Sequence, residues 1–170
     1  MFSTPEWLQD ALLWALGAAV VAIMIYRQLR RRQLTLRRLA ALPLVVAVLA
    51  FIVDPDMVDR LHQSLDLMVF GVGVLLAVAT GIARAFTMDV SIVDDVAFAQ
   101  GNRRTVILWC LTFALRIGEF VTAHYIGAEE GVGEAMLFFA TTLTSQSCTL
   151  AWRGAVALRS TRNDAMEFVE

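Results

Sequence analysis

TVILWCLTFALRIGEFVTAHYI, Thr105 to Ile126, is the stretch of sequence that decides the fold. Its length of about 22 residues gives a helix of about 33 Å, enough to cross a bilayer core of about 30 Å. Arg116 lies near its centre, and Glu119 follows three residues later on the same helix face. Because an isolated charge at mid-bilayer costs roughly 3 kcal/mol, other helices must enclose this one.

The composition agrees with a membrane protein. The chain has 170 residues, of which 58% are hydrophobic and 18% charged, against about 25% charged in soluble domains. We therefore expect a single integral membrane domain over residues 1–170. Cys110 and Cys148 both lie in apolar segments without a metal-ligand spacing, so we expect no metal and no cofactor.

Hydrophobic segments predict an all-α membrane protein, a five-span transmembrane helical bundle. The expected spans are residues 7–26, 39–53, 67–85, 105–126 and 135–158. In the third span, Gly73, Ala77 and Gly81 recur every four residues and form a ridge that lets another helix approach closely. The ridge serves packing within the chain or, as the alternative, a homodimer contact.

The segment between spans three and four breaks the helical pattern. From Phe86 to Ile92 apolar residues alternate with polar ones, and a second alternation precedes Gln100. A period of two is typical of β-strands. We predict a small cytoplasmic β-hairpin at about residues 86–102.

Arginine clusters indicate the topology. The first loop contains Arg27, Arg30, Arg31, Arg32, Arg37 and Arg38, whereas the loops 54–66 and 127–134 are acidic. The positive-inside rule then predicts a multi-pass protein with its N-terminus outside and its C-terminus in the cytoplasm. The same six arginines are candidate contacts for anionic lipid headgroups.

The intramembrane charges are the strongest functional candidates. Arg116 and Glu119 form either a structural ion pair that orients helices or a site for anions or protons. Thr112 lies one turn before Arg116, and Gln146 lies in a fifth span rich in hydroxyl residues. We expect both to contribute to this polar site, with Gln146 bonded to Arg116.

Catalytic motifs are not apparent. The sequence has no phosphate-binding glycine loop, HExxH or GxSxG motif, so an enzyme is the least supported class. His62 and His124 are expected near one side of the membrane and could ligate haem, but neither follows a CxxC attachment motif.

Three segments resemble the CcdC-like family of small bacterial integral membrane proteins. They are YRQLRRRQLTLRRLAALP (26–43), GIARAFTMDV (81–90) and VDDVAFAQGNRRTVILW (93–109). Ala85 stands where the family pattern usually has Gly, and the paired Asp94-Asp95 lacks the Gly that the pattern has after it. The resemblance implies a location in the bacterial inner membrane, and the family name implies a link to cytochrome c biogenesis. No catalytic residues are carried over to this sequence.

Two functions remain open on this evidence. The first is a non-catalytic accessory or assembly factor that binds membrane lipids, a second copy or another membrane protein, and no nucleic acid. The second is a small oligomeric transporter or channel-like protein that uses Arg116 and Glu119. Whether Arg116 lines a water-accessible cavity distinguishes them.

Overall fold

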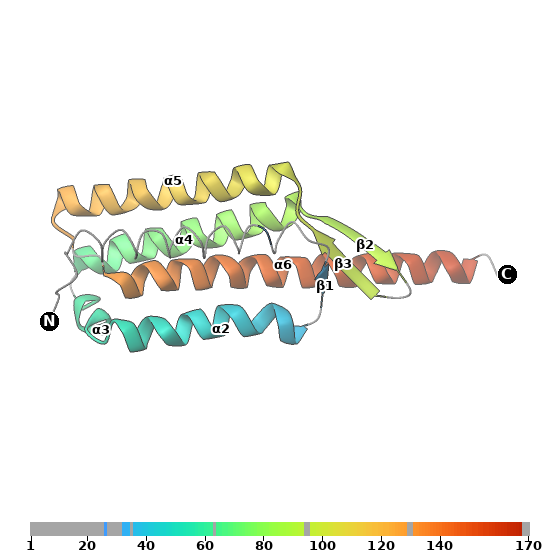
Figure 1. Ribbon diagram of the computed structural model, residues 1–170, viewed down its shortest axis with the longest axis horizontal. Coiled ribbons are helices and arrows are strands. Elements are labelled where there is room, and N and C mark those ends of the chain that lie inside the picture. Colours follow the sequence, from blue (N-terminus) through green and yellow to red (C-terminus); the bar gives the residue numbers. More distant parts are fainter. Residues whose placement is uncertain are drawn as a thin grey trace, which may run out of the picture.

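The computed structural model describes residues 26, 32–34, 36–62, 64–93, 96–128 and 131–167. Within them, long helices lie side by side along one direction, with a small sheet at one end (Figure 1). The helices are α2 (Leu36–Val53), α4 (Ser64–Thr87), α5 (Arg103–Ile126) and α6 (Val132–Glu167), and the short α3 (Met57–Arg60) connects α2 to α4. We call the end with the strands the sheet end and the opposite end the distal end.

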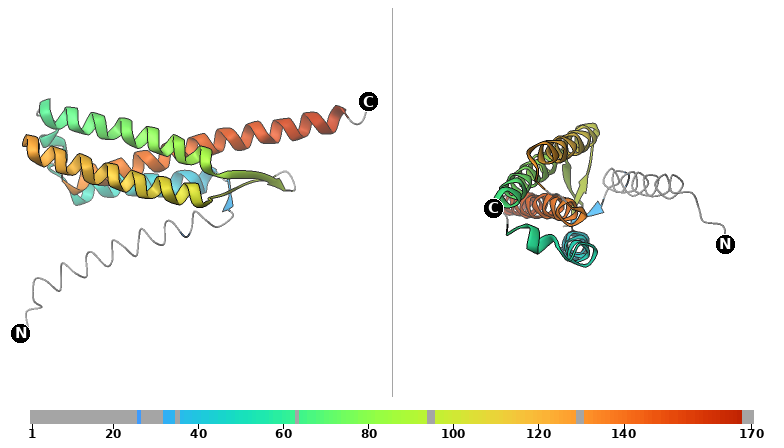
Figure 2. Two further views of the ribbon diagram at one scale, coloured as in Figure 1. Left: turned by 90° about the horizontal axis from the view of Figure 1, so that it is seen from above. Right: turned by 90° about the vertical axis from the view of Figure 1, so that its left-hand side faces the viewer.

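Helix α6 organises the bundle. It packs against α4 on one side and α2 on another, while α5 packs mainly on α4. The end-on view in Figure 2 shows α6 between its two main neighbours. Its length of 36 residues corresponds to about 54 Å, and it runs past the sheet (Figure 1).

The predicted hairpin is confirmed. Strand β2 (Asp89–Val93) pairs antiparallel with β3 (Val96–Gln100), in a register that places Asp89 opposite Gln100 and Val93 opposite Val96. A third strand, β1 (Arg32–Gln33), joins the other edge of β3 and gives the order β1-β3-β2. Strand β1 was not predicted, because two residues in an arginine-rich loop show no alternation; pairing with β3 imposes the extended form.

Local signals set the ends of α5. The Asn102 side chain accepts hydrogen bonds from the backbone N–H groups of Arg104 and Thr105, and the Thr105 hydroxyl accepts one from the Asn102 N–H. This reciprocal cap satisfies donors that the first helical turn leaves unpaired. At the other end Gly127 adopts a φ of 79°, a left-handed conformation that glycine enters without cost.

The small-residue ridge of α4 serves packing within the chain. A Cβ added at Gly73 would collide with the Glu119 carboxylate of α5, and one at Gly81 would collide with the backbone oxygen of Thr142 on α6. Ala77 between them is fully buried. Close backbone approach is therefore what these small residues provide.

The expectation of five spans requires a correction. Among the described residues, only α4 and α5 are long and apolar enough to cross a membrane. The apolar part of α2, Leu39–Val53, is shorter than a span, and α6 is not among the candidates because seven hydroxyl or amide residues interrupt its centre. The first expected span, 7–26, lies outside the described residues except for Tyr26.

Candidate functional site

Arg116 and Glu119 form the predicted ion pair on α5. The Arg116 Nη1 atom donates to Glu119 Oε2 over 2.8 Å, and their side chains are 11% and 7% exposed. The Arg116 guanidinium also lies 5.3 Å from the centre of the Phe138 ring of α6, a range in which a cation is attracted to an aromatic face. The pair thus faces the interior, at the junction of α4, α5 and α6.

One carboxylate oxygen of Glu119 accepts no hydrogen bond in this ion pair. Within the part of the chain that the structure describes, Glu119 Oε1 is buried and has no hydrogen-bond partner. It rests against the backbone of Gly73, where any larger residue would displace it. A buried acceptor without a donor costs roughly 1–3 kcal/mol, so this oxygen requires an explanation.

A small cavity adjoins the pair. Arg116, Glu119 and Glu134 line it together with Gly73 and apolar side chains of α4 and α6, and its volume is about 10 Å³. That is close to the smallest space that holds one water molecule, and the polar groups needed to bind a water are present. The cavity therefore has room for a water and for nothing larger.

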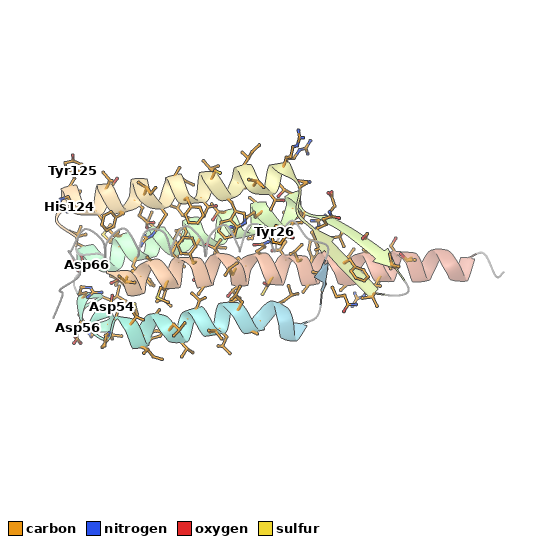
Figure 3. All side chains as sticks on the ribbon, in the orientation of Figure 1. Tyr26, Asp54, Asp56, Asp66, His124 and Tyr125 are labelled. Carbon is orange, nitrogen blue, oxygen red and sulfur yellow. The ribbon has the colours of Figure 1, made fainter. Side chains whose placement is uncertain are left out.

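Glu134 connects the cavity to an ionic cluster at the distal end. Arg60 of α3 donates to Asp54 Oδ2 over 2.6 Å and to Glu134 Oε1 over 3.1 Å. The backbone N–H groups of Gly131 and Gly133 donate to Glu134 and Asp54 respectively. Figure 3 shows Asp54, together with Asp56, Asp66 and His124, at this end.

The cluster shifts the ionisation of its members outside the long helices. Hydrogen bonds from the Arg60 guanidinium and the Gly133 N–H lower the pKa of Asp54, although its partial burial opposes the shift. The bond to Asp54 and the proximity of Glu134 raise the pKa of Arg60. Asp54 and Arg60 therefore stay charged across the physiological pH range.

On its other side Glu119 borders a large groove. The groove lies between α4 and α5, has a volume of about 640 Å³, and is lined almost wholly by apolar residues such as Met68, Val72 and Leu115. Glu119 is the one charged side chain among the described residues that line it. This carboxyl group thus separates an apolar surface from a polar cavity.

The structure places the other two predicted residues of this site differently. The Thr112 hydroxyl is buried and donates to the backbone oxygen of Leu108 in its own helix. Gln146 is also buried, but its Nε2 lies 3.3 Å from the sulfur of Met88, toward the sheet end. Neither residue lines the cavity beside Arg116.

Most of the other polar side chains in the centre of α6 donate hydrogen bonds to the backbone of their own helix. Hydroxyl groups of Thr142, Thr144, Ser145 and Thr149 each donate to the carbonyl group four residues earlier. Ser147 instead donates to the Leu39 carbonyl and ties α6 to α2. These bonds allow a polar helix to sit in the middle of the bundle.

Sequence reasoning missed a second buried arginine. Arg84 of α4 is completely buried and stacks on Trp109, with its guanidinium carbon 3.8 Å from the ring centre. Its three guanidinium nitrogens have no hydrogen-bond partner among the described residues. Arg84 lies seven residues after Ala77, on the same helix face, and this spacing was the available signal that its side chain points inward.

Sequence reasoning also missed the connection between Arg60 and Glu134. Arg60 ends the short helix α3 and Glu134 lies in the first turn of α6, 74 residues apart. In the sequence each resembles an ordinary charge of a polar connection. Only the packing of the α2–α4 connection against the start of α6 brings them together.

The remaining candidates are not assembled into a site. His62 Nδ1 lies 2.9 Å from the Val58 oxygen, and His124 packs edge-on against Tyr125. Among the described residues no group of three or more His, Cys, Asp or Glu side chains could hold a metal ion. Of the predicted headgroup contacts, Arg27, Arg30 and Arg31 lie outside the described residues, as do the side chains of Arg32, Arg37 and Arg38.

Comparison with models of known protein families, with curated proteins and with solved structures finds no match for this chain.

Proposed function

We propose that this chain is a multi-pass protein of the bacterial inner membrane that acts without catalysis, as an accessory or assembly factor for other membrane components. The resemblance of its three junction segments to the CcdC-like family points in the same direction. The physical support comes from the exposed surface of the bundle and from the surroundings of Arg116.

The exposed surface supports a location in lipid. In the most apolar windows of α4 and α5 only 22% of the residues are buried. Large apolar side chains such as Leu75, Ile107 and Ile117 are more than 60% exposed. Extended apolar surface is costly in water and is expected where lipid or another protein covers it.

The enclosed position of Arg116 within the bundle is the observation that best supports the accessory role. A transport path would place this cation on a water-accessible cavity that spans several residues. Arg116 is instead only 9% exposed, is paired with Glu119, and adjoins a space of about 10 Å³. This geometry fits an ion pair that fixes α5 against α4 and α6.

A small oligomeric transporter or channel-like protein is the second candidate. The observation in its favour is that Glu119 borders both the groove and the cavity, so a modest movement of α5 would connect the two.

Native mass spectrometry after gentle extraction into lipid nanodiscs tests the proposal. We expect the chain with bound lipid, as a dimer, or in complex with a second membrane protein. A retained water-soluble ligand would contradict the accessory role, and so would solute uptake by liposomes that contain the pure protein. Uptake that is lost on Arg116→Gln would establish the second candidate.

A further inference from the structure

One side of α5 is largely uncovered by the other elements that the structure describes. Its residues recur every three or four positions and therefore share one face of the helix. Ile117 and Phe120 are 63% and 55% exposed, and Cys110 is exposed as well. We call this side the open face of α5, and it consists of Cys110, Phe113, Ile117 and Phe120.

The open face borders α6. The centre of the Phe113 ring lies 5.3 Å from the centre of the Phe139 ring on α6. The apolar groove between α4 and α5 is lined instead by Leu111, Leu115 and Gly118, which lie on a different side of α5. A further helix placed on the open face would therefore contact α5 and α6 together.

Strand β1 fixes the chain beside α6 at the sheet end (Figure 2). The next residue, Leu34, lies against Gly154 of α6, where an added Cβ would be 3.0 Å from the Leu34 Cδ1 atom. Gly154 follows Phe139 by fifteen residues, which places it only about 60° away around α6. The first expected span, residues 7–26, ends six residues before Arg32, a separation of at most about 22 Å. This short connection requires the span to end near the sheet, on the side of α6 that borders the open face.

The length and composition of the expected span match α5. Residues 11–26 contain no charged side chain, so lipid or apolar protein surface suits them. A helix over residues 7–26 would be about 30 Å long, against about 36 Å for the 24 residues of α5. Because α5 begins at the sheet end and the expected span finishes there, the two would run antiparallel.

The residue sizes on the two sides are complementary. Small residues recur in the expected span at intervals of four, three and four, on one face of a helix, at Ala11, Ala15, Ala18 and Ala22. Small side chains let a neighbouring helix with large side chains approach closely in a membrane. In an antiparallel alignment from the sheet end, Ala22 falls opposite Cys110. The same alignment brings Ala15 opposite Ile117.

We propose that residues 7–26 pack antiparallel along the open face of α5 and complete the bundle beside α6. The occupant of this face is the chain's own amino-terminal segment, not a second copy and not lipid. The proposal does not rest on the accessory role, because it concerns only how the chain folds in lipid.

Disulfide formation with the native Cys110 tests the proposal. In a Cys148→Ser background, membranes that contain Ala22→Cys are oxidised with copper phenanthroline and the disulfides are mapped by mass spectrometry without reduction. We expect an intramolecular disulfide for most of the chain, because a disulfide forms only when the two Cα atoms come within about 7 Å. Val20→Cys is the matched control: it lies on the opposite side of a helix from Ala22 and should stay reduced.

A second pair decides the question if Ala22→Cys fails to accumulate. Ala15→Cys and Ile117→Cys, combined in a Cys110→Ser, Cys148→Ser background, probe the same contact two turns away, with Leu13→Cys and Ile117→Cys as the control. An intramolecular disulfide at either pair and not in its control supports the proposal. The proposal is overturned if neither pair forms that bond or if the controls form it equally. A disulfide between two copies, seen as a dimer on a non-reducing gel, also overturns it and assigns the open face to a second copy.

Discussion

At the scale of single residues, the two members of the α5 ion pair differ in what their removal leaves behind. Glu119→Gln keeps the length of the side chain, an oxygen that can accept from Arg116 and the fit against Gly73, so we expect a loss of stability of about 1–3 kcal/mol. Arg116→Gln leaves two carboxyl groups at the cavity without their cation, and we expect a loss of about 3–5 kcal/mol.

Unfolding titrations with SDS in mixed micelles measure both effects, with Asp56→Asn as the control that should match the wild type. Equal losses for Glu119→Gln and Arg116→Gln would show that the charge of Arg116 contributes no more to stability than the charge of Glu119.

Asp54 makes the stability of the distal end dependent on pH. Its pKa in the folded protein is lowered by Arg60 and the Gly133 N–H, so folding favours its ionised form. The contribution is fully present above the pKa of the unfolded chain, about 3.9, and is lost as the pH falls through the lower folded value. We expect stability to decrease below about pH 4 in the wild type and this part of the decrease to be absent in Asp54→Asn. Unfolding titrations at pH 3 and pH 6 compare the two; identical pH dependence would contradict the assignment.

At the scale of the elements, we expect a Gly→Ala substitution to change stability in opposite directions at two positions of α4. A Cβ at Gly81 would collide with the Thr142 backbone, which cannot move aside as a flexible side chain could. We expect Gly81→Ala to cost about 1–3 kcal/mol. Gly71 is exposed with nothing within 4 Å of an added Cβ, so Gly71→Ala should gain up to about 1 kcal/mol from helix propensity. Unfolding titrations of the pair test the α4–α6 contact; a neutral Gly81→Ala would show that the helices are further apart than described.

The helices and strands also show which features of the fold the sequence could predict. Period-two alternation predicted β2 and β3, and the length of the apolar segments predicted the cores of α4 and α5, because these signals are local. The two-residue β1, the ionic cluster of Asp54, Arg60 and Glu134, and the inward side chain of Arg84 depend on contacts between distant segments, which a single sequence does not display. Gln146 was expected beside Arg116, but the structure places its amide nitrogen 3.3 Å from the Met88 sulfur. Predicting this position required the relative positions of α5 and α6, which the sequence does not display.

At the scale of the whole molecule, the charge distribution predicts which end of the bundle lies in the cytoplasm. The α5 start at the sheet end carries Arg103 and Arg104, whereas the distal end gathers Asp54, Asp56 and Asp66 (Figure 3). The positive-inside rule predicts that the sheet end lies in the cytoplasm and the distal end outside.

Single cysteines report this orientation directly. In a Cys110→Ser, Cys148→Ser background, we expect a membrane-impermeant maleimide to label Asp59→Cys in intact spheroplasts and to leave Arg103→Cys unlabelled until the membrane is opened. Both positions are exposed in the fold, so a difference in labelling reports the side of the membrane rather than burial. Labelling of Arg103→Cys alone would invert the orientation, and equal labelling of both in intact spheroplasts would show that α4 and α5 do not cross the membrane.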